Sequence, residues 1–155
     1  MLIGIVLTAC APTENAPTTP TSTVNSGPLP DGAYKATITV LNPPTTLRAG
    51  EKAAINVKLK NVGSSVWPAQ GQGPKYKVDL ANHWLDSKGV EVIKDDGRAS
   101  LPHDLKPGDE AELVLTVTAP KTPGDYVLEL DMVHEDVAWF KNKGSQTTKV
   151  NIKVQ

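Results

Sequence analysis

The sequence predicts an all-β fold, an antiparallel β-sandwich of about seven strands preceded by a disordered linker. Three observations carry this prediction. Hydrophobic residues occupy every second position in short segments, which is the period of a half-buried strand. Glycine-containing turns separate these segments. No long window shows the 3.6-residue period of an amphipathic helix.

The predicted strands follow one another between residue 35 and the end of the chain. Their ranges are 35–41, 52–60, 76–85, 90–94, 110–118, 126–133 and 148–154. Outside the short 90–94 candidate, the inward-facing residues are, in chain order, Ala36, Ile38 and Val40; Ile55, Val57 and Leu59; Val78, Leu80 and Trp84; Ala111, Leu113, Leu115 and Val117; Tyr126, Leu128, Leu130 and Met132; and Val150, Ile152 and Val154. The alternate residues, including Lys58, Lys77, Asp79 and His83, are expected to point outward.

Three turns come directly before predicted strands, at Gly50, Gly108 and Gly124. The last two follow a proline. Pro-Gly suits the central positions of a type II turn, because glycine accepts the positive φ required there.

Two aromatic residues make the predicted sandwich immunoglobulin-like. Trp84 lies inward on the third strand, where such sandwiches bury a tryptophan. Tyr126 opens the sixth strand directly after a turn, as in a tyrosine corner whose hydroxyl bonds to upstream backbone. Antibody domains place a disulfide cysteine two residues later. Here Leu128 holds that position, with Val57 or Leu59 facing it, so aliphatic packing replaces the disulfide.

The composition limits the function classes. Lys and Arg number 16 against 17 Asp and Glu, giving a net charge of −1. There is therefore no basic field for nucleic acid. Cys10 is the one cysteine, so an intramolecular disulfide is impossible.

The N-terminus resembles that of bacterial lipoproteins. Leu7-Thr8-Ala9-Cys10 follows the apolar run 2–7 and has the pattern of a lipobox. The resemblance implies a signal peptide at residues 1–9, cleavage before Cys10, and acylation of the Cys10 thiol and the new amino terminus. The other interpretation is a free cysteine after a chance apolar run. No basic residue precedes the run, and secretory signals usually have about 15–30 residues, so the natural start could lie upstream.

Residues 10–30 form the predicted tether between that cysteine and a domain at residues 31–155. Its prolines alternate with Thr, Ser and Asn, and Val24 and Leu29 are its sizeable apolar residues. Such a composition buries too little surface to offset its ordering entropy. Prolines favour extended conformations, so about twenty residues reach on the order of 60 Å.

Residues 34–154 resemble a group of immunoglobulin-like modules. The segment Lys60-Asn61-Val62-Gly63-Ser64-Ser65-Val66-Trp67-Pro68 is similar to the start of four-tryptophan-type domains. Trp84, Pro107-Gly108, Pro123-Gly124-Asp125-Tyr126 and Ala138-Trp139-Phe140 resemble domains appended to bacterial glycosyltransferases and methyltransferases. The resemblance implies a binding or architectural module without catalytic residues. This chain has three tryptophans rather than four.

The remaining polar residues favour neither catalysis nor a metal or other cofactor. Strand parity places His83 outward and His134 inward, with His103 in a loop, so no set of histidines converges. Asp95-Asp96-Gly97 lacks the further spaced oxygen ligands of a calcium loop. Glu135 and Asp136 are adjacent and suit a tight hairpin turn, whereas an acid/base pair requires opposed positions. No serine lies in a G-x-S-x-G motif.

Three aromatic residues are the candidates for a ligand or partner site: Trp67, Trp139 and Phe140. With a tight turn at Glu135-Asp136, Trp139 points inward and Phe140 outward. The inward parity then changes before Val150, which requires a bulge or break at residues 141–146, where Gly144 is suited to one. Two interpretations stay open: Trp67 and Trp139 plug the ends of the sandwich, or the aromatic residues form an exposed binding patch.

The sequence therefore predicts a non-catalytic, lipid-anchored, extracytoplasmic binding or adaptor module of the bacterial envelope. Its expected contacts are the membrane, through the lipid on Cys10, and an envelope protein or glycan. A carbohydrate-binding module and a proteinase inhibitor are the alternatives.

Overall fold

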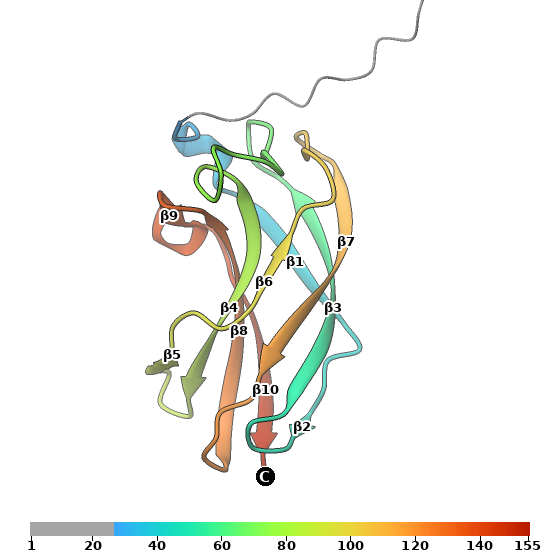
Figure 1. Cartoon of the computed structure of the whole chain (residues 1–155), viewed down its shortest axis with the longest axis vertical. Helices are drawn as coiled ribbons and strands as arrows, with labels where there is room; N and C mark the ends of the chain where they lie inside the picture. Colours follow the sequence, from blue (N-terminus) through green and yellow to red (C-terminus); the bar gives the residue numbers. More distant parts are fainter. Residues whose placement is uncertain (1–26) are drawn as a thin grey trace, which may run out of the picture.

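The structure is a computed structural model, and it describes residues 27–155. Ten strands in these residues form two sheets packed face to face (Figure 1). The smaller sheet has the order β1-β3-β7, from β1 (Ala36–Leu41), β3 (Lys52–Asn61) and β7 (Glu110–Thr118). The larger has the order β2-β10-β8-β4-β5, from β2 (Thr46–Leu47), β10 (Thr148–Val154), β8 (Gly124–His134), β4 (Val78–Asp86) and β5 (Glu91–Ile93).

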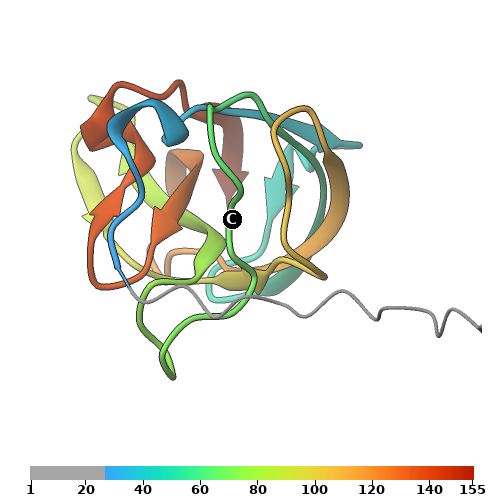
Figure 2. The same ribbon diagram turned by 90° about the horizontal axis from the view of Figure 1, so that it is seen from above.

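Four short elements complete the described chain. β6 (Arg98–Ser100) pairs with β4, and β9 (Ala138–Trp139) pairs with β8. Two 3₁₀ turns, η1 (Asp31–Ala33) and η2 (Phe140–Lys143), lie before β1 and before β10. Seen from above, the two sheets are separate layers, and the loop around residues 70–75 projects beyond them (Figure 2).

The predicted all-β sandwich is confirmed. All seven predicted segments are strands, with ends within two residues of the predicted ones. The strands that the alternation misses are β2, β6 and β9, which have two or three residues each and are too short to show a period. The pairing is antiparallel except where β2 runs parallel to β10. The first strands thus divide between the sheets, with β1 in one and β2 in the other, and the fold is an immunoglobulin-like sandwich.

Trp84 belongs to the hydrophobic core and is 0% exposed. Leu128, Val57 and Leu59 are also fully buried, in the region where antibody domains have their disulfide. The hydroxyl of Tyr126 donates a 3.0 Å hydrogen bond to the carbonyl of Thr122, four residues upstream. Its ring stands edge-on to Trp84, with centroids 6.5 Å apart.

Asp96 joins the two sheets. Its Oδ2 accepts hydrogen bonds from the Trp84 indole at 3.2 Å, the Asn82 amide at 3.2 Å and the Thr118 backbone N–H at 2.7 Å. A Cβ on the next residue, Gly97, would collide with the carbonyl oxygen of Thr116. Only glycine therefore lets the backbone pass this close to β7. Asp95-Asp96-Gly97 lies between β5 and β6 in the chain, and the hydrogen bonds of Asp96 link β4 of the larger sheet to β7 of the smaller one.

Asn61 and Gly63, which belong to the segment similar to four-tryptophan-type domains, each have a structural role in the loop after β3. Buried Asn61 accepts from Gly63 N–H and donates to the carbonyls of Ser65 and Leu105, at 2.9, 2.9 and 2.8 Å. A Cβ on Gly63 would overlap the carbonyl of Ala33. The motif therefore fixes the loop that leads to Trp67.

The lipobox ending at Cys10 and most of the predicted tether lie outside the described residues. Within residues 27–155, no helical segment is long or apolar enough to cross a membrane. Leu29, near the end of the predicted tether, packs against the core.

Candidate functional site

The aromatic residues Trp67 and Phe140 are buried in the hydrophobic core at one end of the sandwich. Trp67 and Phe140 are 0% exposed, and Tyr34 beside them is 1% exposed. The Phe140 ring stands edge-on to both partners, at 5.2 Å from Trp67 and 5.1 Å from Tyr34. The Trp67 indole donates to the Ala33 carbonyl at 2.8 Å. The prediction that Phe140 points outward is wrong, and Trp67 plugs the end of the sandwich.

One additional loop residue explains the error. The pairs His134–Ala138 and Val133–Trp139 leave three residues in the hairpin loop, 135–137, rather than two. Asp136 has φ 60°, the left-handed conformation that such three-residue loops use. Because side chains alternate between faces, a shift of one residue exchanges the faces. Trp139 therefore lies outside the sandwich, half-buried, and Phe140 inside it.

The break predicted at residues 141–146 is present. The 3₁₀ turn η2 lies between β9 and β10, and Gly144, with φ 85°, ends this turn. We call residues 138–147 the strap, since they cross from β9 to β10 at the edge of the larger sheet. We call the side of that sheet turned away from the smaller sheet the outer face.

The strap covers the half of the outer face nearer the β8–β9 hairpin. The Trp139 ring lies on His83, with centroids 4.2 Å apart, and the Arg98 guanidinium carbon is 5.1 Å from the Trp139 ring centre. His83 is 0% and Asp79 is 1% exposed. Their predicted direction, away from the core, is right. They are nevertheless buried, because Trp139 of the strap lies on His83 and the Lys77 ammonium lies against Asp79.

Lys141 of the strap binds two carboxylates of the sheet. Its Nζ lies 3.1 Å from Glu129 and 3.4 Å from Glu91. Burial alone would lower the pKa of Lys141, but these two carboxylates raise it above its usual range. Burial alone would raise the pKa of Glu129, and the hydrogen bonds from Lys141 and Thr147 lower it instead. The ion pairs thus keep both groups charged and fasten the strap.

Asp131 occupies the interruption in strand pairing. β9 pairs with β8 up to Val133, and β10 pairs with β8 from Leu130, so neither reaches Asp131 or Met132. The Asp131 carboxylate accepts from the Met132 N–H at 2.8 Å and from the Lys141 N–H at 3.1 Å, as a missing strand would. Burial raises the pKa of Asp131 to about 6, against the lowering effect of those two hydrogen bonds.

Asp79 and His83 are less well satisfied. Lys77 Nζ is 2.8 Å from Asp79 Oδ2, yet neither oxygen of Asp79 has an aligned hydrogen bond. His83 Nδ1 is 3.3 Å from a Glu91 oxygen, also without hydrogen-bond alignment. Burial and the nearby Lys141 ammonium lower the pKa of His83, so its ring is neutral at neutral pH. We interpret this covered half as a structural network.

The other histidines do not form a site. His134 is buried, as parity predicts, and its ring nitrogens lie 3.0 Å from the Tyr34 hydroxyl and 3.1 Å from the Tyr76 carbonyl. Since a carbonyl can only accept, Nε2 carries the proton and Nδ1 accepts from Tyr34. His103 lies in an exposed loop. Among residues 27–155, no three His, Cys, Asp or Glu side chains group as a metal site would require.

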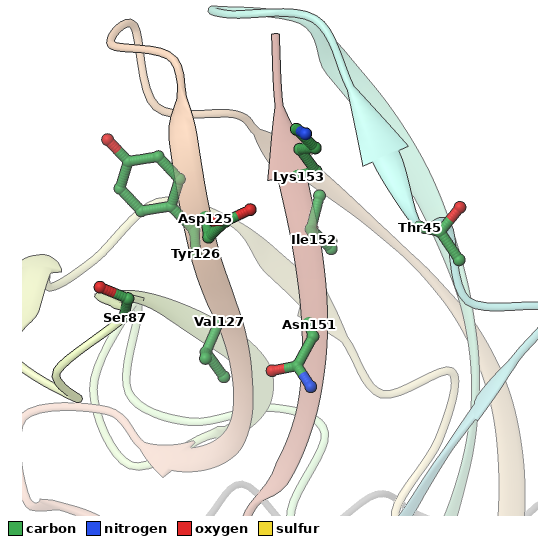
Figure 3. A pocket seen from close by; sticks show the side chains of 8 residues that line it. All are labelled: Thr45, Ser87, Asp125, Tyr126, Val127, Asn151, Ile152 and Lys153. Carbon is green, nitrogen blue, oxygen red and sulfur yellow. The ribbon is translucent and has the colours of Figure 1, made fainter.

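The other half of the outer face is open and contains a hollow of about 400 Å³ (Figure 3). We call it the lower hollow. It is lined by Thr45, Ser87, Asp125, Tyr126, Val127, Asn151, Ile152 and Lys153. Asp125 pairs with Lys153 and Val127 with Asn151, across β8 and β10. Figure 3 shows Ser87 and the Tyr126 ring on one side of these strands and Thr45 on the other.

In two further hollows, polar side chains of the lining are hydrogen-bonded within the domain. In one of about 490 Å³ between β1 and the strap, Ser145 accepts from the Ala36 N–H and Thr148 donates to the Ile38 carbonyl. In one of about 450 Å³ beside the 69–74 loop, Lys77 donates to Ser100. The lower hollow differs because its exposed polar side chains have no such partners within the described chain.

The sequence could not locate the lower hollow, because it depends on which strands are neighbours. Asp125, Val127, Asn151 and Lys153 are all outward by parity in the sequence. Only the pairing of β8 with β10 places them side by side. Of the three predicted aromatic site residues, the structure leaves only Trp139 on the surface.

The chain is similar to several solved structures. The CARDB domain of PF1109 from Pyrococcus furiosus has 17% identity and a TM-score of 0.46, over 77% of this chain and 94% of that one. Spo0M, a sporulation control protein from Bacillus subtilis, has 17% identity and a TM-score of 0.46, over 78% and 49%. A β-glucosidase from Listeria innocua has 14% identity and a TM-score of 0.49, over 77% and 16%. No protein-family model and no curated protein matches the chain.

Proposed function

We propose that this chain is a lipid-anchored, extracytoplasmic binding module of the bacterial envelope, and that it binds through the outer face of its larger sheet. The observation that carries the proposal is the lipobox Leu7-Thr8-Ala9-Cys10 followed by a proline-rich segment and one immunoglobulin-like domain. Two or more acyl chains on Cys10 would give stable attachment without a spanning helix. The domain would then act by binding a ligand or partner.

The position of the open surface supports this assignment. The described chain begins at the end of the sandwich that carries η1, at the top of Figure 1. The lower hollow lies at the opposite end, where β8 begins and β10 ends. A tether attached at one end would therefore present the hollow away from the membrane.

Fractionation of cells that express Cys10→Ala tests the anchor. We expect the unaltered chain in the membrane fraction, and the variant in soluble material or as an uncleaved precursor. Ser22→Ala, within the tether, is the control and should stay in the membrane. Mass spectrometry that found an unmodified Cys10 in the mature protein would contradict the anchor.

A pair of charge reversals tests the binding face. Lys153 lies beside the lower hollow, whereas Lys58 lies on the smaller sheet and pairs with Glu110. We expect Lys153→Glu to reduce binding of the labelled chain to isolated envelopes, and Lys58→Glu to leave it unchanged. Equal effects of the two substitutions would mean that the binding is not made by this face.

A further inference from the structure

The two halves of the outer face differ in the partners of their polar side chains, apart from Asp79 and His83, which have no aligned hydrogen bond in the covered half. Under the strap, Arg98, Glu129, Lys141 and Thr147 are bonded to one another or to neighbours. In the lower hollow, the side chains of Thr45, Ser87, Asp125, Asn151 and Lys153 have no hydrogen bond or ion pair to any described residue. Their donors and acceptors are therefore all available to a ligand.

The available groups surround a small apolar floor. Val127 is half-buried and lies next to Asn151, with which it pairs across β8 and β10. The ring of the next residue, Tyr126, packs toward Trp84 in the core, and its hydroxyl is occupied by the Thr122 carbonyl, so Val127 supplies the apolar contact. A volume of about 400 Å³ is at the lower end of ligand pockets, which span roughly 300–1,000 Å³.

The charge of the hollow favours a neutral ligand. Asp125 and Lys153 oppose each other in register, so the site carries one acid and one base. An ionic ligand would gain from one of them and be repelled by the other. A ligand with several adjacent hydroxyl groups fits better, because each hydroxyl both donates and accepts. Asp125 can accept, Lys153 can donate, and Asn151, Ser87 and Thr45 can do both.

We propose that the lower hollow is a saccharide-binding site that takes one or two neutral sugar units. Val127 would contact the C–H face of a sugar ring, and the five polar side chains would bond its hydroxyls. The proposal names the ligand class of the binding module proposed above and rests on it. It does not depend on the anchor, because the site lies wholly within residues 45–153.

A titration of the full chain followed by nuclear magnetic resonance tests the proposal. The chain would carry Cys10→Ser to prevent acylation. The probes are maltotriose, cellotriose and tri-N-acetylchitotriose, each added to about 20 mM so that millimolar dissociation constants are measurable. We expect at least one of them to shift the backbone amide signals of residues 125–127 and 151–153 in a saturable way. The dipeptide Gly-Gly, which carries both charges, should not.

Two substitutions give the matched comparison. Asn151→Ala should weaken the binding by about fivefold to tenfold, and Asp125→Ala by about tenfold or more, as the loss of neutral and charged hydrogen bonds predicts. Asn56→Ala, an exposed asparagine on β3 of the smaller sheet, is the control and should bind as the parent does.

Three outcomes would overturn the proposal: no trisaccharide shifts the hollow, Gly-Gly shifts it and the sugars do not, or Asn151→Ala binds as well as Asn56→Ala. If Lys153→Glu reduces binding of the chain to envelopes but no sugar binds in the titration, the saccharide is rejected and the proposed binding module is retained. A negative fractionation result would reject only the anchor.

Discussion

Asp131 and Phe140 show at the scale of single residues how a local interruption is stabilised. The chain leaves the sheet between β9 and β10, and this leaves two positions of β8 without a strand partner on that side, although both still pair with β4. Asp131 fills the polar part of the gap with its carboxylate. Phe140 fills the apolar part, between Tyr34 and Trp67. The interruption is thus an ordered feature of the fold.

Phe140→Ala should destabilise the domain by about 3–5 kcal/mol, the usual range for removing a buried phenylalanine ring. Denaturant titration measures the change in the free energy of unfolding. Val114→Ala is the control, since Val114 is 58% exposed and should change stability by no more than about 0.5 kcal/mol. A loss below about 1 kcal/mol for Phe140→Ala would place the ring outside the core.

The pH dependence of Asp131 has a definite sign. Its pKa is raised from 3.8 to about 6, so the folded state binds this proton more tightly than the unfolded state does. The ionised carboxylate therefore opposes folding, fully above pH 6, and the opposition fades as the pH falls toward 3.8. Relative to Asp131→Asn, the wild type should gain about 2 kcal/mol between pH 7.5 and pH 4.5.

Parallel denaturation of wild type and Asp131→Asn at the two pH values measures that gain, and other titrating groups cancel in the difference. Asp125→Asn, an exposed carboxylate on the same strand, provides the comparison. A difference between wild type and Asp131→Asn that stays constant with pH would show that Asp131 is not desolvated in the folded protein.

At the scale of elements, alternation predicted β3, β7 and β10 well because each has one face in the core and the other largely in solvent. β7 and β10 have the predicted bounds for this reason. The faces of β9 could not be predicted, because they depend on whether the preceding loop has two or three residues. Glu135-Asp136-Val137 offers no glycine that would mark the loop length. A single residue then decided which of Trp139 and Phe140 is core.

The strap also depends on the left-handed residue that ends η2. Gly144 has φ 85° and open space where a Cβ would be, so an added side chain would meet only the backbone penalty. Gly144→Ala should cost about 1–2 kcal/mol. Gly144→Asn should cost less, since asparagine tolerates this conformation.

Thermal or denaturant unfolding of the two Gly144 variants ranks them. Equal losses for Ala and Asn would indicate that size, rather than backbone conformation, limits the position. A gain in stability for Gly144→Ala would mean that the η2 cap is not formed as described.

At the scale of the whole molecule, the sequence predicted two packed sheets but not how they are joined. Trp84 and Tyr126 indicated an immunoglobulin-like arrangement, and both lie at the positions that this arrangement requires. The role of Asp96 was not predictable, because its three donors lie on β4 and β7, far apart in the sequence. The lower hollow was not predictable for the same reason. Both features arise from strand neighbours that local periodicity does not specify.

Asp96→Ala tests whether this one carboxylate couples the sheets. The substitution leaves the Trp84 indole, the Asn82 amide and the Thr118 N–H without their acceptor. An unsatisfied buried donor costs about 1–3 kcal/mol, and water can reach part of this half-buried site, so we expect a total loss of about 2–4 kcal/mol. Asp95→Ala is the control, because its partner Arg98 keeps its bond to Glu135. Equal, small losses for both variants would mean that apolar packing alone holds the sheets together and that the Asp96 bonds are exchanged for water at no net cost.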